Sequence, residues 1–120
     1  MIMIGPDGAF DRRRVEREIE RLESLARDLR RLLDEGPSTA ADYPDAPVIH
    51  GWRAHPIQVM CLIGAVSGHP DPLVGKPGRI TATSDLWVFD PARGLARTLS
   101  RVYRLGAPHR DESAAGTSIH

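Results

Sequence analysis

Residues 80–105, ITATSDLWVFDPARGLARTLSRVYRL, carry the clearest turn signal in the chain and half of its Phe, Trp and Tyr side chains. The turn is Asp90–Gly94, DPARG, in which Pro91 presets φ for the second position and Gly94 tolerates a positive φ. Apolar and aromatic residues lie on both sides of it. We therefore predict a β-hairpin over residues 80–105, against which the other segments are buried.

The second arm of this hairpin has an alternative interpretation as a helix. Asp90 would be the N-cap, and Pro91 would occupy the first turn, where proline is tolerated. Gly94 would then lie inside the helix, at a cost of about 1 kcal/mol relative to alanine. The pattern favours the hairpin, but both interpretations stay open. The residues that would share one helical face are Leu95, Thr98, Leu99, Val102 and Tyr103.

Residues 11–35 predict a long N-terminal amphipathic helix, about 37 Å in length. Its apolar side chains recur at alternating spacings of four and three residues, which places them on one face. Charged residues fill the remaining surface, and Gly36–Pro37 is a typical C-terminal stop. Oppositely charged residues four apart can pair, each pair contributing about 0.2–0.5 kcal/mol. These pairs are Glu23 with Arg27, Arg30 with Asp34, and Arg31 with Glu35.

The apolar stripe of this helix has two interpretations. It can cover a sheet of the same chain, which the pattern favours. It can instead pair with a protein partner or with a copy of itself, because the spacing is heptad-like over about three repeats. The candidate partner or self-association stripe consists of Val15, Ile19, Leu22, Leu29 and Leu33, and it also includes Ala26, with Leu25 and Leu32 at its edge.

Two further segments are predicted as strands. Val48–Arg53 is a short candidate, and Ile57–Ser67, IQVMCLIGAVS, is apolar on both alternating faces, which is typical of a strand covered on both sides. One helix covers only one face of a small sheet. The second face of the sheet would have to be buried by curvature of the sheet, by a second protomer, or by the C-terminal arm folded as a helix.

The predicted class is therefore α+β, a long helix followed by a small antiparallel β-meander of about four strands. A chain of 120 residues predicts one domain, which we place at residues 11–106. Residues 1–10 are predicted to be a flexible N-terminus because the segment is short and terminal. Residues 107–120 are predicted to be a disordered tail because they are polar. Within the domain lie the helix 11–35, a linker 36–47 and the β-meander 48–105.

The sequence carries no catalytic signature. Lys76 follows glycines as in a phosphate loop, but Pro77 occupies the position of the Ser or Thr that would hold magnesium. The histidines and Cys61 lack the paired spacing of a zinc site, and Ser84 lacks a nucleophile-elbow context. We therefore expect no enzymatic activity, no catalytic residue, no cofactor and no metal.

Composition predicts the compartment. The chain has 16 basic and 16 acidic residues, so no net field steers it to nucleic acid or to an anionic membrane. It has one cysteine, which fits a reducing compartment, and no apolar run long enough to span a bilayer. We expect a cytoplasmic protein without membrane contact.

The hairpin is locally basic, with five arginines against two aspartates between residues 79 and 104. Arginines interleaved with aromatic residues can hold phosphates and stack bases. A solvated outer face is the alternative, and the neutral balance of the whole chain favours it. The candidate nucleic-acid contacts are Arg97, Arg101, Arg104 and Tyr103.

Three segments together resemble an uncharacterised family, a domain of unknown function, of small alphaproteobacterial proteins found partly on mobile elements. They are PVIHGW at 47–52, SGHP at 67–70 and TSDLWVFDPARGLARTLSRVYRLG at 83–106. The resemblance covers about Pro47–Gly106 and implies a strand–turn–strand unit in the last segment. It implies no catalytic residue and no cofactor, and a mobile-element background suits a small inhibitor or regulator.

Two hypotheses follow for the function. The first is a small non-enzymatic interaction or regulatory protein that binds a protein partner, or itself as a homodimer, through the helix stripe or the second face of the sheet. The alternative is a nucleic-acid-binding module that uses the arginines of the C-terminal hairpin, and its affinity would fall steeply with salt.

Overall fold

The computed structural model of the chain describes residues 1–71 and 79–110. The predictions made for Lys76 and Pro77, and for the tail from residue 111 onward, lie outside the described residues. The described part contains one long helix and a four-stranded sheet in which antiparallel pairing predominates. These elements confirm the predicted α+β class.

Contacts divide the chain into two compact units. One unit is the continuous segment 11–58, which contains the helix. The other combines residues 1–10 with the residues from 59 onward and contains all of the strands. The single domain predicted over residues 11–106 remains a prediction.

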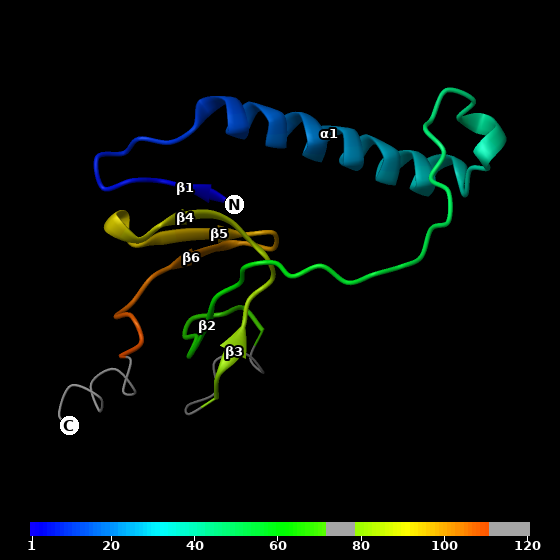
Figure 1. Ribbon diagram of the computed structural model, residues 1–120. Helices are drawn as coiled ribbons and strands as arrows, with labels where there is room; N and C mark the ends of the chain where they lie inside the picture. The colour runs from blue at the N-terminus through cyan, green and yellow to red at the C-terminus, as the bar shows by residue number, and fades with distance from the viewer. Residues whose placement is uncertain (72–78, 111–120) are drawn as a thin grey trace. The chain divides into compact units, whose positions relative to one another are not determined.

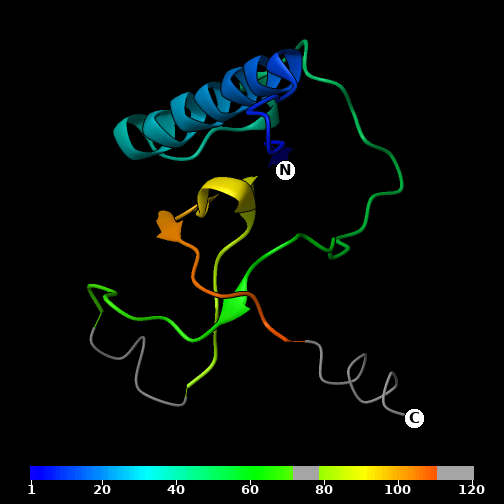
Figure 2. The ribbon, with the colours of Figure 1, turned by 90° about the vertical axis from the view of Figure 1, so that its left-hand side faces the viewer.

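The helix α1 spans Arg12–Glu35, as predicted. Asp11 is its N-cap, and the carboxylate of Asp11 accepts a hydrogen bond of 3.1 Å from the backbone N–H of Arg14. At the other end Gly36 has φ of 79°, and its N–H donates to the carbonyl of Leu32. Figure 2 shows α1, coloured blue to cyan, as one unbroken helix.

The rest of this unit contains no strand. A 3-10 helix η1, Ala40–Asp42, follows α1, and the backbone N–H of its N-cap residue Thr39 donates a hydrogen bond to the carboxylate of Asp42. The strand predicted at Val48–Arg53 is wrong, because these residues are exposed and pair with no other segment. An alternating pattern forms a strand only where a second backbone satisfies its N–H and C=O groups.

The four-stranded sheet has the order β1-β4-β5-β6 (Figure 1). Pairing is parallel between β1 and β4 and antiparallel between the other neighbours. The first strand was not anticipated, since the N-terminus was predicted to be flexible; two residues carry no periodic pattern that could reveal a strand. The four strands are β1 (Ile2–Met3), β4 (Leu86–Asp90), β5 (Leu95–Thr98) and β6 (Val102–Arg104).

The predicted hairpin forms between β4 and β5. A short 3-10 helix η2, Pro91–Arg93, makes the turn, and Gly94 closes it with φ of 72°. This excludes the helical alternative for residues 95–104. The second arm is not one strand, however, because a turn at Leu99–Arg101 divides it into β5 and β6.

Thr98 explains this second turn. Its side chain is fully buried. The hydroxyl donates to the carbonyl of Arg101 at 3.2 Å and accepts from the N–H of Arg101 at 3.2 Å. Side-chain bonds of this kind divert the backbone from a continuous ladder, so the chain reverses here and adds a third antiparallel strand.

A separate two-stranded sheet joins β2, Ile63–Gly64, to β3, Thr81–Ala82. The long strand predicted at Ile57–Ser67, covered on both sides, is therefore wrong. Only two of its residues are in a strand, and Ile57 is 84% exposed. Beyond β2 the backbone N–H of Thr83 donates to the carbonyl of Leu62 at 2.8 Å, while the N–H of Leu62 donates to the hydroxyl of Thr83 at 3.0 Å instead of to a backbone carbonyl.

Candidate functional site

The predicted stripe lies along α1, and most of it is exposed. Leu22 is 37% exposed and Leu33 is 86% exposed, whereas Val15 is half-buried. No residue of α1 is buried. The unit 11–58 contains no second α-helix and no strand that could cover the stripe.

Few charges on α1 are paired within the helix. Of the three predicted pairs the structure forms one, between Arg31 and Glu35 at 3.0 Å. It adds a pair between Arg21 and Glu18 at 2.8 Å. Pairs exposed to solvent contribute little to stability, so these two pairs add little to the stability of the helix.

Arg31 marks the face of α1 that the chain itself uses. Its guanidinium lies 5.5 Å from the ring centroid of Tyr43, a cation–π distance. The hydrogen bond to Glu35, and then the electrostatic effect of Tyr43, raise the pKa of Arg31. At 100° per residue Arg31 lies roughly 160° around the helix from the centre of the stripe. The returning chain therefore packs on the face opposite to the stripe.

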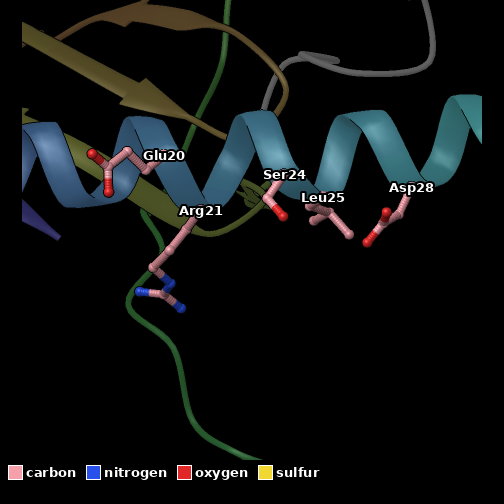
Figure 3. A pocket seen from close by; sticks show the side chains of 5 residues that line it. All are labelled: Glu20, Arg21, Ser24, Leu25 and Asp28. Carbon is pink, nitrogen blue, oxygen red and sulfur yellow. The ribbon is translucent and has the colours of Figure 1, made fainter. Parts of the chain in front are cut away.

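A shallow hollow on α1 offers no ligand site. It is lined by side chains of this single helix (Figure 3). All of the lining residues belong to α1, so a small molecule there would stay largely in water, unlike ligands of ordinary pockets. The lining residues are Glu20, Arg21, Ser24, Leu25 and Asp28.

Two of the predicted nucleic-acid contacts share one face of the sheet. Arg97 and Leu95 alternate on β5, and Leu95 pairs with Arg104 of β6. Residues directly opposite in an antiparallel pair project to the same face, so Arg97 and Arg104 are diagonal neighbours there. Both side chains are exposed.

The structure does not bring the other two predicted contacts to that face. Tyr103 pairs with Ala96, which is 2% exposed, so the tyrosine lies on the opposite face and is half-buried. Arg101 lies in the turn between β5 and β6, where its backbone is bonded to Thr98. Arginine and aromatic side chains are therefore not interleaved on one surface.

An ion-pair cluster at the η2 turn was missed by sequence reasoning. Asp90 is 6% exposed and accepts 3.3 Å hydrogen bonds from both the backbone N–H and the Nη1 of Arg93. The same guanidinium donates to the carbonyls of Gly5 and Pro6 at 3.2 and 3.3 Å. The Arg93 side chain thus joins the N-terminal turn, which contains Gly5 and Pro6, to the hairpin. The DPxR spacing was its only local signal, and the partner carbonyls are more than 80 residues away.

Trp87 is a second unexpected feature. The pairing register shifts between Leu86 and Val88, so Trp87 is the extra residue of a β-bulge. Its indole Nε1 is buried without a hydrogen-bond partner in the part of the chain that the structure describes. A bulge redirects a side chain in a way that alternation along the sequence does not predict.

The described residues form neither a metal-binding cluster nor a membrane-spanning helix. Within residues 1–71 and 79–110, no group of three or more His, Cys, Asp or Glu side chains is placed to hold a metal ion. Cys61 is half-buried with a free thiol. Among the helices described, none combines the length and apolar character needed to cross a membrane.

Comparison with known proteins gives a family match. A protein-family model, described as a family of unknown function, matches residues 18–116. This span contains most of α1 and the whole β4-β5-β6 meander but leaves out β1. No curated protein and no solved structure matches the chain.

Proposed function

Since the chain belongs to the DUF6634 family, whose function is unknown, we propose that it is a small non-enzymatic interaction protein that acts through contacts with another protein. The proposal includes a regulatory role in the cytoplasm of an alphaproteobacterial cell, on the resemblance of residues 47–106. The binding surface is the stripe on α1.

The exposed stripe carries this proposal. A contiguous apolar surface on a soluble protein costs free energy in water and commonly marks a binding surface. Here it runs the length of a 24-residue helix, within a unit that has no strand. The face of α1 opposite to the stripe, called the outward face below, already carries the contact between Arg31 and Tyr43. A protein surface of matching apolar shape would stabilise the helix most.

Substitution of Leu22 by glutamate tests the stripe. We expect the Leu22→Glu protein to lose the partners that the wild-type protein captures after cross-linking in host cells, because a buried carboxylate is strongly disfavoured. The control is Ser24→Glu, an equal charge change within one turn on the outward face, which should keep the same partners. Mass spectrometry identifies them, and circular dichroism verifies equal helix content.

Equal capture by both variants would reject the stripe as a binding surface. If the stripe covered a sheet of its own chain instead, Leu22→Glu would lower the melting temperature of a monomer without changing the captured set. That result would also reject the proposal, since the stripe would be internal.

Nucleic-acid binding is a second candidate, favoured by the two exposed arginines on one sheet face. It predicts that a labelled single- or double-stranded oligonucleotide binds at 50 mM salt and that affinity falls steeply at higher salt. Replacing both Arg97 and Arg104 by alanine should reduce the slope of log affinity against log salt by about 2. Arg79→Ala, at an exposed position outside the sheet, is the control. Absence of any anisotropy change at 50 mM salt would remove this candidate.

A further inference from the structure

We propose that the protein bound to the α1 stripe is a second copy of this chain, whose α1 runs antiparallel to the first. In this arrangement Arg30 of each copy faces Glu16 of the other. The inference rests on the proposed function, and it adds the identity of the partner and its orientation.

The core of such a pair is set by the spacing of the stripe. Alternating steps of four and three residues place its members at positions a and d of a heptad repeat. In the antiparallel register that centres the two helices on residue 24, each a residue faces a d residue. The layers are Val15 with Leu33, Ile19 with Leu29, and Ala26 with Leu22, and each occurs twice by symmetry.

Packing favours this orientation over the parallel one. A parallel pair would place Ala26 against its own copy, which leaves a void in the middle of the core. The antiparallel register instead places Leu22 against Ala26, so a large side chain meets a small one. Well-packed cores alternate large and small residues in this way, and voids are destabilising.

Charge gives a second, independent reason. The residues that flank the core at positions e and g pair with the other helix. In a parallel pair Glu18 would face Glu23 of the other copy, twice, which is repulsive. In the antiparallel pair Arg30 faces Glu16 twice, which is attractive. Glu23 meets its own copy once at the two-fold axis.

The charges needed for the antiparallel pair are not already used by ion pairs among the described residues. Neither Glu16 nor Arg30 forms an ion pair in the described part of the molecule, whereas Glu18 is paired with Arg21. Position g adds apolar contact, because Leu25 meets its own copy and Leu32 lies over the aliphatic stem of Glu18. Both leucines are more than half exposed in the single chain.

A charge-swap series on the full chain tests the pairing. Light scattering over a concentration series should show a dimer whose dissociation constant rises about tenfold in Glu16→Arg, and about tenfold in Arg30→Glu. The double variant, Glu16→Arg with Arg30→Glu, should restore the wild-type value. A dimer in which the single swaps have no effect, or in which the double variant is not restored, would overturn the antiparallel arrangement.

Distances between spin labels test the orientation directly. In a Cys61→Ser background, a label at Arg13→Cys lies near one end of α1 on its outward face. The antiparallel pair separates the two labels by about 33 Å along the axis, whereas a parallel pair places them side by side. Ser24→Cys is the control, since its labels are level in either orientation. Short distances at both positions would contradict the inference.

Failure of the inference is distinguishable from failure of the proposed function. A strict monomer at high micromolar concentration removes the self-pairing. If partner capture is then still abolished by Leu22→Glu and kept by Ser24→Glu, the stripe binds a different protein and the proposed function stands. If capture is also insensitive to Leu22→Glu, both are rejected.

Discussion

Replacing Ile2 by alanine is expected to lower the free energy of unfolding of the sheet unit by about 2–3 kcal/mol. Ile2 is 7% exposed, although it lies next to the first residue of the chain. It pairs with Val88 in the parallel ladder, and Ile4 continues that ladder by donating to the carbonyl of Phe89. Truncation to alanine removes most of the buried side chain and leaves a cavity beside β4.

Tryptophan fluorescence during urea unfolding measures this effect. The chain has two tryptophans, and Trp52 lies in the other unit, so a Trp52→Phe background leaves Trp87 of β4 as the reporter. The control is Met3→Ala on the same strand, where the side chain is 50% exposed and the loss should be less than about 1 kcal/mol. Equal losses for Ile2→Ala and Met3→Ala would show that β1 is not held by burial.

Replacing Asp90 by alanine is expected to cost about 2 kcal/mol of stability. Two hydrogen bonds to its carboxylate are lost, one from the backbone N–H that it caps at η2 and one from the guanidinium of Arg93. The same guanidinium then has only the carbonyls of Gly5 and Pro6 to orient it. The N-terminal turn should therefore loosen together with the η2 turn.

Urea unfolding of Asp90→Ala in the same reporter background gives the stability change. Hydrogen exchange of the Ile4 amide, which bonds to Phe89, reports on the N-terminal segment and should accelerate. Asp85→Ala is the control, because it removes the same charge while the contact of residue 85 with Leu99 uses its backbone carbonyl. A stable Asp90→Ala protein with unchanged exchange would contradict the role given to this cluster.

The periodicity of the sequence predicts which residues form the stripe, but it does not predict how the candidate nucleic-acid contacts are arranged on the sheet. The stripe follows from helical spacing, which holds for any uninterrupted helix, and Asp11 and Gly36 fix where α1 begins and ends. The grouping of Arg97, Arg101, Arg104 and Tyr103 rested on their closeness in the locally basic segment of the sequence. The turn at Leu99–Arg101 breaks the alternation along this segment, so Tyr103 lies on the other face.

The sequence alone determined two elements of this protein, α1 and the turn at Asp90–Gly94. Both depend on interactions within a few residues, namely end caps, helical hydrogen bonds and the φ preferences of proline and glycine. Tertiary structure decided the rest, because a strand needs a partner backbone. Ile2–Met3 has one in β4 and forms a strand without any pattern, whereas most of the apolar segment Ile57–Ser67 has none and stays outside the sheets.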